Sequence, residues 1–304
     1  MISTGLEYWD QSLARAMEPG GGVAHLLADP RLSSALRVAA VGALDAFDTN
    51  TTLNVIFLDL GTFSLGFLAL YLNAIGGITH RRLAELSGRS TILSRGRASA
   101  ILGMLRVKGI VTRHTDPAGQ VIYRPSDNVV RFFRDRFRVE IEAAFEVAPG
   151  VKPVLDRLDD PGVFERYLAM FGMQWVAAGA NDHPAFVPFK KIMSRRAGML
   201  ILFAMMMEAD KGGEFPRQGR FVLSVSALAR RFRVSRSQVL RVLRDLETQD
   251  LLRIDTAKGE GEFTARLVDQ YRAYTAFVMF YSINFCHQFL ASYAPAETAR
   301  VATR

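Results

Sequence analysis

One pattern of residues occurs twice in this chain of 304 residues, and it limits the possible folds more than any other feature. In the later copy, residues 226–232 have the apolar spacing of a short helix, and Arg233 and Val234 form a tight connection after it. Ser235 can cap the helix that follows, because its hydroxyl can accept an unpaired backbone N–H. Apolar residues at helical spacing predict one buried stripe on that second helix: Val239, Val242, Leu243 and Leu246.

A β-hairpin is predicted after each pair of helices. In the later copy, residues 251–254 and 263–267 flank a turn-rich segment at 258–261. In the earlier copy, residues 110–113 and 120–123 flank the turn signal Asp-Pro-Ala-Gly. The earlier copy also has a supporting helix over 79–87, which Thr79 caps, and a second helix with its own core stripe: Ala98, Ile101, Leu102 and Leu105. The order of elements is therefore the same in both copies.

The two copies align with a shift of 141 residues, which places Ser94 on Ser235 and Val111 on Leu252. The connection between the helices differs, since the earlier copy has more residues before the aligned serine. Its second helix either begins one turn sooner, at Ser90, or follows a longer turn. We expect Ser90 to be the cap.

The basic residues gather in these two copies. Residues 215–244 contain eight arginines and no acidic residue, and residues 80–113 contain eight Arg or Lys and one acid, Glu85. The rest of the chain holds 22 basic and 29 acidic residues, although the net charge of the whole is +8. Such a concentration of positive charge is typical of a surface that binds a polyanion.

The second helix of the later copy has an outward face suited to DNA. Arginine can reach guanine edges and glutamine adenine edges, while serine and arginine bind phosphates. Residues of the later copy expected to contact double-stranded DNA are Arg230, Arg231, Arg233, Ser235, Arg236, Ser237, Gln238, Arg241, Arg244 and Lys258. Those of the earlier copy are Arg81, Arg82, Arg89, Ser90, Thr91, Ser94, Arg95, Arg97 and Arg113. The later copy is expected to dominate, because the earlier helix offers Gly96, Ala100 and Gly103 on its outward face.

Residues 228–252, which include Val234-Ser235-Arg236-Ser237 and end in Leu251-Leu252, resemble bacterial winged helix-turn-helix regulators. The earlier copy, with its hairpin sequence RHTDPAGQVIY at 113–123, is similar to the multiple-antibiotic-resistance regulator type. The resemblance covers residues 79–125 and 223–267. It implies a mainly α fold with small β-hairpin wings, built from two winged helix-turn-helix domains in tandem. It also implies DNA binding through Ser235, Arg236, Ser237, Gln238 and Arg241, with the wing near the DNA backbone.

The flanking segments complete a predicted layout of five parts. These are an N-terminal helical segment (1–54), a first domain with its trailing helix (55–147), a helical connector (148–195), a second domain with its trailing helix (196–292) and a frayed tail (293–304). Helices are expected near 5–18, 30–47 and 164–177, and the trailing helices are expected over 128–147 and 268–291.

Three very apolar helices are expected at 65–75, 199–207 and 273–291. Their Met and aromatic content exceeds what one small domain needs, so we expect them to pack the two copies together or to form a homodimer interface. A small-molecule pocket among them is a further alternative, although Met-rich stripes are more often packing. The longest charge-free stretch, 273–286, is too short to span a bilayer, so no membrane association is expected.

No enzyme, metal or cofactor signature stands out. Cys286 and His287 are adjacent on a helix, so their side chains diverge and cannot act as a nucleophile–base pair. The five histidines are scattered without metal-ligand spacing, and no phosphate loop or dinucleotide fingerprint occurs. One cysteine and an N-terminus without a signal pattern fit a cytoplasmic protein.

The sequence therefore predicts sequence-specific binding of double-stranded DNA, most simply by a bacterial transcriptional regulator without an enzymatic activity. The 141-residue repeat raises the hypothesis that one chain reads two half-sites as a pseudo-dimer. Two other classes stay open: a replication initiator built from tandem winged helices, and a chromosome-associated scaffold that binds proteins and does not read DNA. The effector, the operator and the sign of regulation are not predicted.

Overall fold

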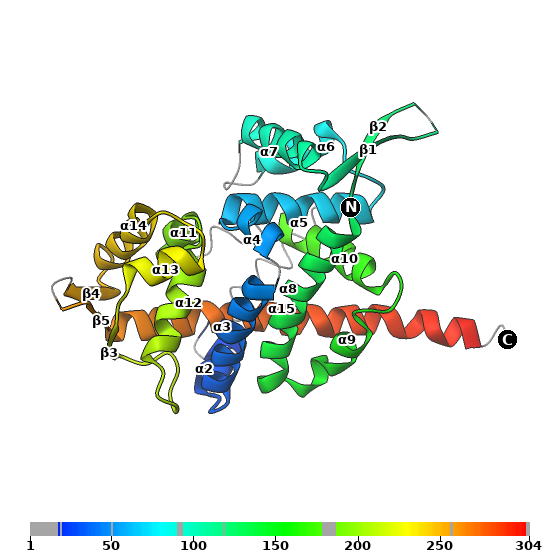
Figure 1. The fold of residues 1–304 in the computed structure, drawn as a ribbon. Helices are drawn as coiled ribbons and strands as arrows, with labels where there is room; N and C mark the ends of the chain where they lie inside the picture. The colour runs from blue at the N-terminus through cyan, green and yellow to red at the C-terminus, as the bar shows by residue number, and fades with distance from the viewer. Residues whose placement is uncertain are drawn as a thin grey trace.

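The computed structural model describes residues 18, 20–49, 51–89, 94–117, 119–177, 187–255 and 258–301. It is mainly helical, with two small antiparallel sheets (Figure 1). The helix expected near 5–18 lies outside the described residues, as do Ser90 and Thr91. No helix in the described part is long and apolar enough to cross a membrane.

The first half of the chain contains α2 (Gly22–Ala28), α3 (Leu32–Thr49), α4 (Thr51–Ile56), α5 (Leu60–Ala74), α6 (His80–Arg89), α7 (Arg95–Val107), β1 (Val111–Thr115), β2 (Val121–Pro125) and α8 (Asp127–Val147). A short 3-10 turn at Pro149–Val151 leads into α9 (Lys152–Arg157), α10 (Val163–Ala177) and α11 (Val187–Met193). The second half contains α12 (Gly198–Ala209), β3 (Gly219–Val222), α13 (Val225–Arg231), α14 (Arg236–Glu247), β4 (Leu252–Asp255), β5 (Glu260–Phe263) and α15 (Ala265–Val301). The helices predicted near 30–47 and 164–177 are confirmed as α3 and α10.

The same order of elements occurs twice. One unit runs α5, α6, α7, β1, β2 and α8, and the other runs α12, β3, α13, α14, β4, β5 and α15. Residues that are 141 positions apart also share a backbone conformation just after the second helix of each unit. Gly109 and Asp250 both have positive φ, at 67° and 54°, and the next N–H donates to the carbonyl of Leu105 and of Leu246, respectively. A left-handed residue that closes a helix in this way is a common helix stop.

The predicted cap at Ser90 is wrong. The helix α7 begins at Arg95, and the Ser94 hydroxyl accepts the backbone N–H of Arg97 at 3.2 Å. Ser94 has the extended backbone of a cap, with ψ at 152°, and Ser235 has ψ at 154°. The additional residues of the earlier copy therefore belong to a longer turn between the two helices. The cap at Thr79 is confirmed, since its hydroxyl accepts the N–H of Arg82 at 3.1 Å.

Both hairpins form, although one strand differs from the expectation. β1 pairs with β2, and β5 lies between β3 and β4. The strand predicted at 263–267 ends at Phe263, because the Thr264 hydroxyl accepts the N–H of Leu267 at 3.3 Å and starts α15. The third strand, β3, was not predicted; its Phe221 stacks on Phe263 with ring centroids 4.5 Å apart. In the earlier unit a single bridge between Ile78 and Tyr123 takes its place.

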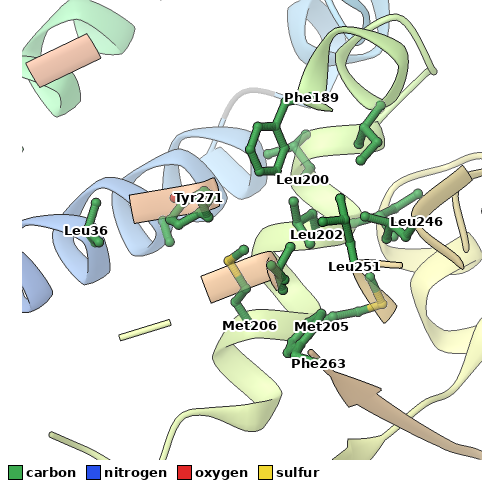
Figure 2. Packing of buried hydrophobic residues seen from close by; sticks show 14 of the residues in the cluster. Leu36, Phe189, Leu200, Leu202, Met205, Met206, Leu246, Leu251, Phe263 and Tyr271 are labelled. Atoms are coloured by element: carbon green, nitrogen blue, oxygen red, sulfur yellow. The ribbon is translucent and has the colours of Figure 1, made fainter. Parts of the chain in front are cut away.

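The apolar helix α12 lies at the centre of one hydrophobic cluster. Figure 2 shows Leu202, Met205 and Met206 of this helix among side chains from several elements of the later unit and from α3: Leu36, Leu246, Leu251, Phe263 and Tyr271. A second cluster joins α5, α7, α8 and α10 around aromatic side chains such as Phe133 and Phe171. Each unit therefore has a core of its own.

The long helix α15 joins the two clusters. Its first part, with Leu267, Tyr271 and Phe277, lies in the cluster of the later unit. Its second part, with Phe285 and Phe289, lies in the cluster of the earlier unit. Within one chain, this helix packs the two units together as expected. The expected end near residue 291 is wrong, since the helix continues to Val301; alanine, glutamate and arginine favour helix even without an apolar stripe.

Candidate nucleic-acid interface

The helix α14 is fixed to the core of the later unit by its buried face. The expected stripe of Val239, Val242, Leu243 and Leu246 is confirmed as buried. The Ser235 hydroxyl accepts the N–H of Gln238 at 3.1 Å and caps the helix. The tight connection before the cap has Arg233 in the left-handed region, with φ at 53°. The opposite face of α14 is therefore held in one orientation toward solvent.

Six side chains of α14 are exposed: Arg236, Ser237, Leu240, Arg241, Arg244 and Glu247. Leu240 was not predicted, and 43% of it is exposed. It stands one turn after Arg236 and one turn before Arg244, off the buried stripe. Apolar contact with a thymine methyl group is one of the direct base contacts that an α-helix can make.

Gln238 is held by the chain itself. It is only half-exposed, and its amide Nε2 donates to the backbone carbonyl of Arg196 at 3.2 Å. Gln238 was expected to point outward to DNA bases together with Arg241 and Arg244. It can do so only if this hydrogen bond breaks. Because Arg196 lies between α11 and α12, the contact could not be inferred from the α14 sequence.

Several arginines of the later unit are not neutralised by an acid. Among the described residues, no carboxylate lies within 4.0 Å of five exposed side chains: Arg230, Arg233, Arg236, Arg241 and Arg244. Arg231 differs, since its Nη2 is 2.9 Å from an oxygen of Asp48. Lys258 also differs, with its Nζ 2.8 Å from Asp255. The open positive charge therefore includes α14 and the turn before it, whereas Lys258 in the hairpin turn is paired.

A buried acid ties α14 to α11. The Asp245 carboxylate accepts from Nε of Arg195 at 2.7 Å and lies 2.8 Å from Nζ of Lys191. Burial by itself raises the pKa of this carboxyl, but the bonds from Arg195 and Lys191 outweigh burial and lower the pKa below its ordinary value. The sequence signal for this site is that Asp245 is the first acid after the arginine-rich run. The contact fixes how α14 sits on the core.

The equivalent face of α7 carries less charge. Under the shift of 141 residues, its outward positions are Arg95, Gly96, Ser99, Ala100 and Gly103. Arg97 is exposed but lies 3.6 Å from Asp59, the residue that caps α5. At these five positions α7 therefore carries one arginine, where the equivalent positions of α14 carry three.

The remaining predicted residues of the earlier unit are spread over α6 and the hairpin. Arg81 pairs with Glu85 at 2.9 Å, and Arg82 donates to the carbonyl of Gly77 at 3.3 Å. Arg113 is exposed on β1. The Arg89 side chain lies outside what the structure describes, as do Ser90 and Thr91.

The two second helices lie on one side of the long α15 in the view of Figure 1. Both α7 and α14 are drawn above α15, and the hairpins β1–β2 and β4–β5 are at opposite outer ends.

The single cysteine is buried, and burial raises the pKa of its thiol to about 12. A thiol with such a pKa is protonated at neutral pH and is a poor nucleophile. No group of three or more His, Cys, Asp or Glu in the described part of the chain is placed to hold a metal ion. No protein-family model, curated protein or solved structure matches this chain.

Proposed function

We propose that this chain binds double-stranded DNA in a sequence-specific way, through two winged helix-turn-helix units in tandem, and acts as a bacterial transcriptional regulator. The observation that carries the proposal is the outward face of α14. Arg236, Arg241 and Arg244 are exposed there without a described acidic partner, on a helix whose other face is buried. An α-helix of this kind fits the major groove, and arginine is the commonest side chain that reads guanine.

The elements around α14 support this function. Helix α13, the tight turn at Arg233, helix α14 and the hairpin β4–β5 follow in the order of a winged helix-turn-helix unit. The order recurs in α6, α7, β1 and β2, with the same serine cap. Symmetric regulators read two half-sites with two such helices. A single chain with two units would read an asymmetric pair of half-sites, with α14 supplying most of the base contacts.

The positive charge also supports binding to a polyanion over binding to a neutral protein surface. Cations such as Arg230 and Arg233 lie beside the start of α14 and would contact phosphates. A module that binds only proteins would not need unpaired cations on this helix. Homodimer formation through α5, α12 or α15 remains part of the proposal, as an addition to the pairing of units within one chain.

Selection of bound fragments from random or genomic DNA tests the function directly. The account predicts enrichment of one short motif by the full chain, and loss of that enrichment when Arg236 and Arg241 are both changed to alanine. Recovery of sequences without a shared motif would contradict specific reading. Enrichment of repeated origin sites that the protein melts would point to an initiator, and capture of proteins without any duplex binding would point to a scaffold.

A further inference from the structure

A cavity of about 190 Å³ lies between α5, α8, α10 and α15, with Met193 of α11 at its edge. Its walls are mostly aromatic, and the side chains that line it include Phe63, Phe67, Phe137, Phe171, Tyr274 and Tyr281. Several of these rings contact one another, as Phe137 and Phe171 do at 5.2 Å between centroids. Concave apolar sites with a few polar groups are typical of sites for small molecules.

Besides the tyrosines, three polar side chains line this mostly apolar space: Ser64, Glu140 and Ser282. The Ser64 hydroxyl on α5 is buried and has no hydrogen-bond partner among the described residues. Glu140 on α8 also lines the cavity, and its side chain is exposed to solvent. Among the described residues, no cation lies within 4.0 Å of its carboxylate. The carboxylate is therefore open to a cationic group that enters from solvent.

The nearest opposite charge does not neutralise Glu140. Arg136 stands one turn earlier on α8, but its Nη1 donates to the carbonyl of Ala43 at 3.3 Å. Its guanidinium also lies over the ring of Phe132, 5.8 Å from the centroid. These contacts hold Arg136 against α3, on the far side of Phe63 in a neighbouring hollow. Arg136 therefore forms no ion pair within 4.0 Å of the Glu140 carboxylate.

Glu140 is the group in this cavity that titrates near neutral pH. Burial raises its pKa to about 7, partly countered by Arg136. The neighbouring acids come from α10 and α15: Tyr167, Tyr274, Tyr281 and Cys286. Burial raises the pKa of each of these groups, and the charge of Glu140 adds to the rise for Tyr167, Tyr274 and Cys286. All four stay protonated, so the site presents one ionisable carboxyl among aromatic rings.

We propose that this cavity binds a small organic cation, with an apolar body among the aromatic rings and a protonated amine on the carboxylate of Glu140. Aromatic faces attract ammonium groups, and the carboxylate provides the charged hydrogen bond. The Ser64 hydroxyl, which is buried without a described partner, offers a further hydrogen bond to the ligand. An anionic ligand is disfavoured, because it would meet Glu140 and none of the described residues that line the cavity is a lysine or an arginine.

The position of the cavity gives such a ligand contact with both units. Its lining comes from α5 and α8 of the earlier unit and from Phe277 and Val278 on α15 of the later unit. A bound molecule would therefore join the helices through which the two units pack. The proposal concerns ligand binding alone and does not depend on whether the chain binds DNA.

Calorimetric titration of the full chain with phenethylamine and with phenethyl alcohol, in the absence of DNA, tests the proposal. The two probes share one apolar body and differ in the amine. We expect the amine to bind about tenfold or more tightly than the alcohol, since a charged hydrogen bond in an apolar site is worth at least that factor. Glu140→Gln should remove this preference and leave the alcohol affinity unchanged. Glu142→Gln, two residues further along the same helix, is the matched control and should retain it.

A second readout keeps the test decisive if Glu140→Gln alters the fold. With the unaltered chain, the affinity for the amine should rise about tenfold between about pH 6 and about pH 8, as Glu140 ionises, while the affinity for the alcohol stays constant. Equal binding of amine and alcohol, unchanged amine binding in Glu140→Gln, or no binding of either probe would overturn the proposal.

Discussion

The hydroxyls of Ser94 and Ser235 accept the backbone N–H of Arg97 and Gln238, at 3.2 and 3.1 Å. Two serines in equivalent positions of the two units therefore cap the helices that carry the candidate DNA-binding faces. Each hydroxyl satisfies a donor that would otherwise have no partner in its helix. The direction in which each helix starts depends on this bond.

Replacement of either cap by alanine should destabilise the chain. Ser94→Ala and Ser235→Ala are each expected to lower the free energy of unfolding by about 1 kcal/mol, and aspartate in the same positions should restore most of it. Denaturant unfolding followed by circular dichroism measures the effect. Ser99→Ala, on the exposed face of α7, is the control and should leave stability unchanged or slightly raised. Equal effects at Ser94 and Ser99 would refute the cap.

Loss of the Asp245 carboxylate should weaken the attachment of α14 to the protein core. Asp245→Asn leaves Arg195 and Lys191 without their carboxylate and should lower the free energy of unfolding by about 2 kcal/mol at neutral pH. The folded state lowers the pKa of Asp245, so its contribution is present above the unfolded value of about 4 and is lost as the pH falls through the folded value. The difference between the two proteins should therefore shrink in acid. A difference that stays constant down to about pH 2 would argue against this ion pair.

The local features of both units could be predicted from the sequence, because they repeat over a few residues. The buried stripe of α14 follows from apolar spacing, and the hairpins follow from turn residues between short apolar runs. The choice between Ser90 and Ser94 failed, although the alignment of Ser94 with Ser235 already favoured the second. The distance along the chain from the cap to the positive-φ residue that ends the helix is the same in both units. Counting back from Gly109 by the spacing between Ser235 and Asp250 therefore indicates Ser94.

Contacts between distant segments could not be predicted in the same way. Asp245 pairs with Lys191 on α11, and Gln238 donates to the carbonyl of Arg196, which follows α11. Arg97 lies beside Asp59, just before α5. No local sequence pattern marks these partners. The carboxyl of Glu140 faces a cavity only because four helices meet around it. Such sites depend on how the helices pack, which helical periodicity alone does not determine.

Two glycines on the exposed side of α7 serve no packing purpose within the chain. A methyl group added to Gly103 would meet nothing within 4 Å, and the same is true of Gly96. Because glycine in a helix interior costs about 1 kcal/mol relative to alanine, Gly103→Ala should raise the free energy of unfolding by about that amount. The contrasting variant is Gly66→Ala, whose methyl would lie 2.6 Å from Phe133, and this one should destabilise. Thermal unfolding distinguishes the two, and a loss of stability in both would show that α7 is packed on that side.

Removal of the charge of Glu140 should stabilise the chain in base but not in acid. The folded state raises the pKa of Glu140 to about 7, above the unfolded value of about 4.3, so folding stability is lost as the pH rises through about 7. Glu140→Gln avoids that loss. Its melting temperature should exceed that of the unaltered chain at about pH 8 and match it below about pH 4, where the carboxyl is protonated in both the folded and the unfolded protein. A higher melting temperature at both pH values would assign the gain to packing instead of charge.

Binding to a labelled duplex that carries the selected motif, measured by fluorescence anisotropy over a series of salt concentrations, tests the central claim most directly. The account predicts that Arg236→Ala with Arg241→Ala weakens binding about a hundredfold, while Arg95→Ala with Arg97→Ala weakens it about tenfold. Lys152→Ala with Arg157→Ala removes the same charge from α9, in the lower part of Figure 1, and should change affinity little. Affinity should also fall steeply as salt rises. Equal losses from the α14 and α9 pairs, or a flat salt profile, would contradict DNA reading by α14.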